Sequence, residues 1–336
     1  MRRGSIVQLV VIGLLSGAIA TAIALFVPWM PTAATTQAEG IFFTYWFATV
    51  ISLFVFSVVA AVLIYSIINF RADPDDWSDG PPIHGHTTIE IVWTVIPAIL
   101  VTAISIVSAI VLAQNGKAGS NPLRIGVIGQ QFAWQFKYEN GQTYPILRVP
   151  LDRKVELQIT ANDVIHSFWV PQFAQKQDAV PGAPQKLVIT PNRLGTYPVI
   201  CTELCGLGHS LMRSQAIVMT EAEYDAWYES GGGTAGGDGT GGGTAEATFT
   251  GNGCQACHSF SAIPSAQGKI GPSLDNLSEA AAAAGLPLEE FIRQSIVDPG
   301  AYVAPGYVAG TMPSFETQIP ADKLDELVQY LAENTK

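Results

Sequence analysis

The sequence predicts a membrane-anchored protein of several domains: apolar helices, then an all-β sandwich, then a small all-α domain. Long uncharged stretches fill the first third of the chain, short alternating strands fill the middle, and helical periodicity marks the C-terminus. These three observations predict the fold class. A net charge of −11 in 336 residues also excludes a nucleic-acid partner, because polyanions bind basic surfaces.

Three uncharged stretches, residues 4–38, 42–70 and 91–116, are each long enough to cross a bilayer as a helix. Residues 1–40 are assigned as an N-terminal apolar segment. Residues 41–116 are assigned as a transmembrane helical hairpin. The chain is therefore expected to be a multi-pass membrane protein.

The N-terminal apolar segment has two interpretations. Arg2 and Arg3 precede it, as in a signal peptide, but its uncharged run exceeds the usual signal core of about 7–15 residues. We therefore favour a retained third helix. Residues 31–41 lack Lys and Arg while Arg71 follows the second stretch, so the positive-inside rule places a retained N-terminus in the cytoplasm. Both interpretations place the later domains outside the cytoplasm.

Residues 117–229 are expected to form an all-β Greek-key sandwich. In KVELQIT, Val155, Leu157 and Ile159 alternate with polar residues, the period-2 pattern of a half-buried strand. Similar runs occur at residues 124–129, 131–138, 166–170, 186–190 and 214–219. Evenly spaced short strands are typical of a sandwich or barrel.

The tract SGGGTAGGDGTGGGTAE, residues 230–246, has no apolar side chain larger than alanine and is predicted to be a flexible linker. Residues 247–336 are predicted to form the all-α domain. Its last helix is expected over residues 320–334, with an apolar face made by Leu324, Leu327, Val328 and Leu331.

The four cysteines form two close pairs, each followed by a histidine, so metal or cofactor binding explains them better than disulfides. CQACH contains the CxxCH signature of covalent c-type haem: Cys254 and Cys257 would attach the haem and His258 would bind the iron. A zinc knuckle is the alternative. It needs a second Cys/His pair, and none follows His258.

Met312 is the candidate for the sixth iron ligand, since it is the only methionine after the haem signature. A lone methionine is more often core packing, but its Gly/Pro turn ahead of the last helix favours ligation. Residues 245–336 resemble class I cytochrome c, including GPSL at residues 271–274. The resemblance implies that Pro272 orients the proximal histidine.

CTELCGLGHSLM, residues 201–212, concentrates thiol, imidazole and thioether groups, which are the ligands of soft copper sites. The spacing of Cys201, Cys205 and His209 is also compatible with zinc on one face of a helix. Two glycines favour a loop instead, at one end of the sandwich as in a cupredoxin.

Two thiolates can bridge two copper ions, and each ion then needs its own imidazole. Of the remaining histidines, His84 and His86 lie on the other side of the predicted membrane, and His258 belongs to the haem signature. His166, in NDVIHSFWVP, is the candidate that remains.

DVIHSFWVP followed by CTELCGLGHSLM resembles subunit II of haem-copper cytochrome c oxidases, which carries the binuclear copper A centre. The resemblance implies six metal-binding residues: His166, Cys201, Glu203, Cys205, His209 and Met212. The cysteines would bridge the coppers, each histidine would bind one, and the methionine would be a weak axial ligand. Glu203 would give its backbone carbonyl to copper and its carboxylate to a magnesium ion shared with subunit I.

The resemblance extends to two other stretches. IEIVWTVIPAIL matches the family's second hairpin helix, and Glu90 falls on a carboxylate near a proton pathway of subunit I. A solvated helix end is the equally weighted alternative. In GQQFAWQFKY, Phe132 replaces a tryptophan through which soluble cytochrome c often delivers electrons, while Trp134 is kept. Both aromatic residues are electron-path candidates, and the attached haem domain is expected to replace docking of a soluble partner.

Fused chains of this kind are similar to subunit II of caa-type oxidases of the bacterial plasma membrane. The implied function is to pass electrons from a donor through haem c and copper A to subunit I, which reduces oxygen to water. Subunit III and a donor, either a cytochrome c, another redox protein or an upstream quinol-oxidising complex, are the further partners implied.

Three alternatives differ in class. A nitric oxide reductase with a copper A subunit would use the same electron-entry parts. A copper-binding assembly protein would need no haem. A quinol oxidase subunit II would lack the copper ligands that Cys201 and Cys205 supply.

Overall fold

The computed structural model describes residues 3–71, 75, 80, 82, 84–230, 245–316 and 319–336. Arg2 and residues 231–244 of the predicted linker lie outside the described residues. The chain divides into two compact units, Met1–Thr32 with Glu39–Asn115, and Ala33–Ala38 with Gly116–Lys336.

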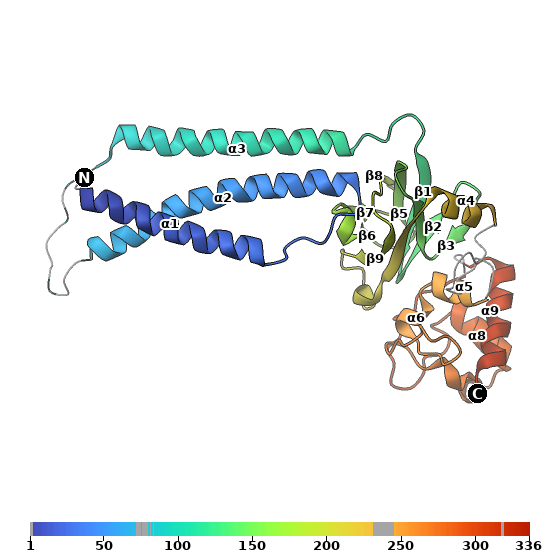
Figure 1. The fold of residues 1–336 in the computed structure, drawn as a ribbon. Coiled ribbons are helices and arrows are strands. Elements are labelled where there is room, and N and C mark those ends of the chain that lie inside the picture. Colours follow the sequence, from blue (N-terminus) through green and yellow to red (C-terminus); the bar gives the residue numbers. More distant parts are fainter. Residues whose placement is uncertain are drawn as a thin grey trace. The chain divides into compact units, whose positions relative to one another are not determined.

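The first unit is made of three apolar helices, α1 (Arg3–Phe26), α2 (Thr36–Asn69) and α3 (Thr87–Asn115) (Figure 1). Within the described part of the chain, these three helices are long and apolar enough to cross a membrane. Helix α1 packs on α2 through small residues, because a Cβ on Gly17 would lie 2.6 Å from the Ser57 hydroxyl. Close approach through small residues is how helices associate in lipid.

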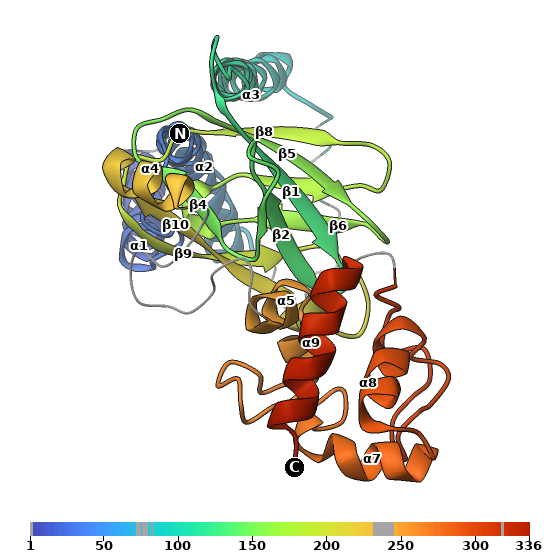
Figure 2. The ribbon, with the colours of Figure 1, turned by 90° about the vertical axis from the view of Figure 1, so that its right-hand side faces the viewer.

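In the second unit, the described residues form two five-stranded sheets that face each other (Figure 2). The first sheet has the order β3-β2-β1-β5-β8 and contains β1 (Leu123–Gln130), β2 (Ala133–Lys137), β3 (Thr143–Tyr144), β5 (Val155–Ala161) and β8 (Gln185–Ile189). The second has the order β4-β10-β9-β6-β7 and contains β4 (Leu147–Pro150), β6 (His166–Trp169), β7 (Lys176–Ala179), β9 (Gly195–Cys201) and β10 (Arg213–Met219). Strand pairs β1–β5 and β4–β10 are parallel, and the others are antiparallel.

Strand β5 follows the predicted alternation with one difference. Val155, Leu157 and Ile159 are fully buried between the sheets, as expected. Glu156, expected on the solvent side, is also buried, because Arg124 and Lys186 on the neighbouring strands lie 3.8 and 3.5 Å from its carboxylate. The ion pairs compensate the carboxylate for its lost hydration.

Helix α4 (Glu221–Glu229) closes the β domain by adding Tyr224 and Trp227 to its core. The remaining helices are α5 (Ala245–Gly251), α6 (Cys254–Cys257), α7 (Leu277–Ala284), α8 (Leu288–Val297) and α9 (Ala321–Asn334), and they share a separate core. The four predicted apolar residues of α9 are all buried there. Helix α9 lies against α8 and α5 (Figure 2). Helix α5 begins at Ala245, inside the predicted linker.

Candidate metal centre and cofactor cavity

Sheet pairing brings His166 and Cys201 to the same end of the second sheet. His166 is the first residue of β6 and Cys201 is the last residue of the antiparallel neighbour β9. The register Phe168↔Cys201 places the histidine just beyond the end of β9. A ligand from residue 166 and the loop that starts after residue 201 therefore meet, although 35 residues separate them.

Residues 202–212 form a loop with one 3₁₀ turn, η2 (His209–Leu211), so the helical zinc alternative is wrong. A backbone hydrogen bond closes the loop, because the Cys201 N–H donates to the Met212 carbonyl at 3.2 Å. The inward-facing sulfurs are buried while the outer leucines are not: Leu204 is 79% exposed and Leu207 is 68% exposed.

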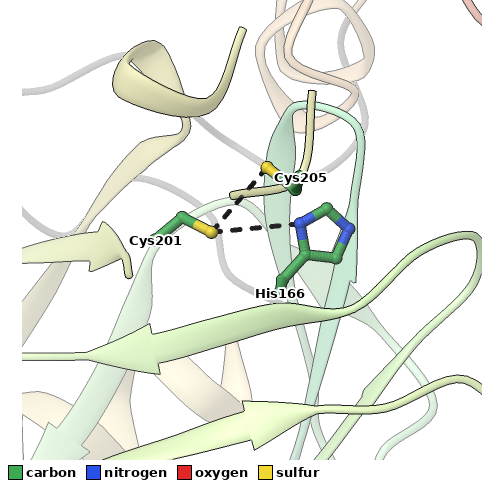
Figure 3. Close-up of side chains that lie close together, drawn as sticks. All are labelled: His166, Cys201 and Cys205. Atoms are coloured by element: carbon green, nitrogen blue, oxygen red, sulfur yellow. Dashed lines mark hydrogen bonds between the residues drawn. The ribbon is translucent and has the colours of Figure 1, made fainter. Parts of the chain in front are cut away.

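The loop and β6 bring five predicted donor side chains together. The Cys201 Sγ lies 3.9 Å from the Cys205 Sγ and 4.0 Å from the His166 Nδ1. Figure 3 shows these three side chains pointing toward one another. The Cys205 Sγ lies 3.6 Å from the His209 Nδ1 and 3.9 Å from the Met212 Sδ. With metal–sulfur bonds of about 2.3 Å, one ion can contact both sulfurs, so the donor set fits a soft metal such as copper.

The backbone carbonyl and the side-chain carboxylate of Glu203 lie in different surroundings. Its backbone carbonyl lies 3.3 Å from the Cys201 Sγ, beside the donors. Its side chain is exposed. The carbonyl therefore lies beside the candidate metal donors, and the predicted magnesium role of the carboxylate stays a prediction.

Asp163 fixes the orientation of the His166 ring. The His166 Nε2 lies 2.8 Å from the Asp163 Oδ1, so that nitrogen donates and the Nδ1 presents its lone pair to the sulfurs. Burial lowers the pKa of His166, but the hydrogen bonds and negative charges of Asp163 and Cys201 together outweigh burial, so the net pKa is raised. Burial raises the pKa of Asp163, yet hydrogen bonds from His166 and from the Gln131 and Val164 amides lower it overall. The motif NDVIH contains the signal for this contact, a carboxylate three residues before a candidate histidine ligand. Sequence reasoning missed it.

The two thiols of the loop titrate as a coupled pair. A hydrogen bond from Cys205 lowers the pKa of Cys201, and the same contact raises the pKa of Cys205. One thiolate is thus favoured without a metal. A metal that binds both sulfurs has to displace the remaining proton.

Trp134 and Phe132 are both buried, at 1% and 6% exposure. The Trp134 ring meets the His166 ring edge to face, with centroids 6.1 Å apart. A Cβ on Gly208 would lie 2.5 Å from the Phe132 ring, so this ring packs directly on residues 201–212, the candidate copper loop. Both predicted electron-path residues therefore contact elements of the candidate metal centre.

A second candidate site is a cavity in the C-terminal domain. Its wall carries Cys254, Cys257, His258 and Met312 among mainly apolar side chains: Phe249, Leu274, Phe291, Ile292, Ile296, Phe315, Leu327 and Leu331. An apolar cavity that crosses a domain core suits a large flat cofactor better than a single zinc ion. The residues present therefore fit the predicted haem.

His258 is held for ligation by its backbone surroundings. Its Nδ1 lies 2.8 Å from the Pro272 carbonyl, which accepts the ring N–H and leaves the Nε2 lone pair free. A Cβ on Gly271 would lie 2.5 Å from the ring, so only glycine fits there. Burial lowers the pKa of His258, which favours the neutral ring that a metal needs. Burial also raises the pKa of Cys254 to about 12.

Glu90 belongs to the first turn of α3 and is exposed. One oxygen of its carboxylate accepts the His86 backbone N–H at 3.0 Å. This contact matches the alternative interpretation, a solvated helix end, and the role in proton entry stays a prediction.

Known protein families match both the apolar helices and the β-sandwich of this chain. The models for the transmembrane and periplasmic domains of cytochrome c oxidase subunit II match residues 20–111 and 142–220. A cytochrome c oxidase subunit 2 of Synechocystis sp. is 35% identical, covering 65% of this chain and 81% of the relative. One of Alkalihalophilus pseudofirmus is 31% identical, covering 88% of this chain and 87% of the relative.

Among solved structures, the periplasmic domain of subunit II of cytochrome oxidase of Bradyrhizobium japonicum is 26% identical. The match covers 34% of this chain and 96% of that chain, with a TM-score of 0.33. The sequence matches to the two relatives, which extend over most of each relative's length, establish that this chain belongs to the cytochrome c oxidase subunit II family.

Proposed function

We propose that this chain is the electron-entry subunit of a haem-copper oxidase of the caa type, with copper A in the loop and haem c in the C-terminal domain. The observation that carries the proposal is the cluster of two thiols, two imidazoles and a thioether, in which every donor atom lies within 4.0 Å of a cysteine sulfur. Each copper would take one histidine, and both would share the sulfurs of Cys201 and Cys205.

Two observations support the haem c part of the proposal. The CxxCH segment and Met312 line one apolar cavity, in which the His258 Nε2 is available to iron. The match to the Alkalihalophilus relative covers 88% of this chain, whereas residues 1–229 make up about two thirds of it. That relative therefore shares sequence with the region beyond the sandwich.

When bound, the haem and the copper pair supply one-electron carriers between an external donor and subunit I. The protein would hold each group by a histidine whose ring is oriented by a hydrogen bond: His166 by Asp163, and His258 by the Pro272 carbonyl. The low polarity around both sites excludes water, which limits reorganisation when charge changes. Oxygen reduction belongs to subunit I, with the two folded domains outside the cytoplasm and the N-terminus inside.

Spectroscopy of the full chain, purified in detergent with attached haem and added copper, tests this function. We expect an EPR signal from one unpaired electron shared over two coppers, beside a low-spin c-type haem. In stopped-flow reduction of the assembled oxidase, the haem should be reduced before the copper. A signal from isolated single coppers, or copper reduction that precedes haem reduction, would overturn the proposal.

A further inference from the structure

The C-terminal domain contacts the β domain through amide side chains. We infer that these amides hold the two domains in one orientation, which places the turn Gln131–Phe132 between the copper loop and the haem cavity. This inference rests on the proposed function, since it treats the cavity as a haem site. It assigns a positioning role to residues that bind neither metal.

An amide relay connects the two domains, made of the Thr248 carbonyl and the side chains of Asn252, Gln130 and Asn162. Asn252 follows α5 and is 6% exposed, and Gln130 ends β1 and is 1% exposed. The Gln130 Nε2 donates to the Asn252 Oδ1 at 3.2 Å, and the Gln130 Oε1 accepts from the Asn162 Nδ2 at 3.2 Å. The Asn252 Nδ2 donates to the Thr248 carbonyl at 2.7 Å.

Both amides at the centre of the relay are buried and bonded at both ends. A buried amide that loses its partner is costly, because water cannot replace the bond. Sliding or turning the domains would break the Gln130–Asn252 bond. The relay therefore favours one orientation over its neighbours.

Backbone packing beside the relay is equally close. Gly253, with φ +75°, lies against the turn, where a Cβ would meet the Ala133 Cβ at 2.9 Å and the Phe132 carbonyl at 3.0 Å. The Gln135 Nε2 also donates to the Gly251 carbonyl at 3.3 Å. Residues 251–253, just before Cys254, therefore pack directly against the turn between β1 and β2.

The turn Gln131–Phe132 contacts both the candidate copper loop and the cavity. The Gln131 Nε2 donates to the Cys205 carbonyl at 2.6 Å, and the Gln131 N–H donates to the Asp163 Oδ2 at 2.7 Å. Gln131 and Phe132 also line the cavity that contains His258. Packed atoms and hydrogen bonds, rather than a layer of water, thus connect the copper loop with the cavity.

Hydrogen exchange on the full chain in detergent tests the relay. Two variants break it from opposite sides: Asn252→Ala, and Gln130→Leu, which keeps the apolar part of the side chain. Asn334→Ala is the matched control, since Asn334 also donates to the carbonyl four residues earlier but is exposed on α9. We expect exchange at residues 129–133 and 249–253 to rise about tenfold in both relay variants and to stay unchanged in the control.

The second readout is the rate of haem-to-copper electron transfer after rapid reduction. Both relay variants should slow it, and the control should not. Unchanged exchange at residues 129–133 in Asn252→Ala, or faster exchange with an unchanged transfer rate, would overturn the inference. Missing haem or copper spectra in the unsubstituted chain would instead refute the proposed function, while the exchange pattern would still report the docking.

Discussion

The candidate copper loop (residues 201–212) and the candidate haem cavity would each hold a redox group, but their protein surroundings differ. In the candidate copper loop the two cysteine sulfurs already lie 3.9 Å apart, and each lies within 4.0 Å of one histidine nitrogen, beside a β core that is closed without any metal. In the C-terminal domain the donors line a cavity inside a core of helices and loops. We therefore expect the β domain to fold without its metal, whereas the helical domain would use the proposed haem as part of its core.

The largest effect should follow removal of haem attachment by Cys254→Ala with Cys257→Ala. Without the haem, the cavity stays open and most of the helical core loses packing contacts. The helical domain should therefore lose its cooperative unfolding transition, since the free energy of unfolding of a typical domain is only about 5–15 kcal/mol. Calorimetry of the full chain measures this loss, and the β-domain transition serves as the internal control. An unchanged helical-domain transition would show that the cavity needs no occupant.

A smaller effect on stability is expected from Cys201→Ser. The shared-copper EPR signal should disappear, because one thiolate cannot bridge two ions in the same way. The unfolding temperature of the copper-free β domain should change by about 5 °C or less, since serine keeps the shape and the sheets are closed. A collapse of the β domain in copper-free protein would contradict the contrast between the two regions.

Asp163→Asn should weaken copper binding without removing a ligand. An asparagine cannot orient and polarise the His166 ring as a carboxylate does, and loss of such a partner lowers metal affinity about 10–100-fold. Competition with a copper chelator measures the change. Asp225→Asn, at an exposed position of α4, is the control and should leave the affinity unchanged.

The smallest effect concerns α4, which touches neither site. Thr220 caps this helix and exchanges hydrogen bonds with Glu223, so Thr220→Ala should cost about 1 kcal/mol of β-domain stability. Hydrogen bonds from the Thr220 amide and hydroxyl lower the pKa of Glu223 from its ordinary value of 4.5. The carboxylate contribution is therefore present above pH 4.5 and is lost as the pH falls through the lowered pKa.

Urea titrations of Thr220→Ala and the unsubstituted chain at pH 7 and at pH 3 measure this difference. The gap between the two proteins should be smaller at pH 3. A gap that widens in acid would mean that the capping carboxylate does not contribute.

Elements with strong periodicity could be predicted from the sequence, and short or polar ones could not. The helices of the first unit are predicted from their long uncharged stretches, and β5 and α9 from the spacing of their apolar residues. Strands β3, β4 and β7 span two to four residues, and β7, KQDA, pairs by its backbone at a sheet edge. No side-chain pattern marks such a strand.

The site residues also differ in how far the sequence predicted them: residues within one motif were found, and contacts between distant residues were not. Cys201, Cys205 and His209 share one motif, and His166 followed from the count of histidines. The contact between Gln130 and Asn252 joins residues 122 positions apart and consists of two ordinary amides. Such contacts depend on how two domains dock, so they cannot be predicted from the spacing of residues within a short motif.

The exposed leucines of the copper loop bear on the order in which the protein is built. Leu204 and Leu207 cover the outside of a loop whose sulfurs face inward. A partner surface that covers these leucines also closes the approach to the sulfurs from that side. If copper binds this loop, we therefore expect it to enter before a partner covers the leucines, because a chain assembled without metal would have lost that route to the sulfurs.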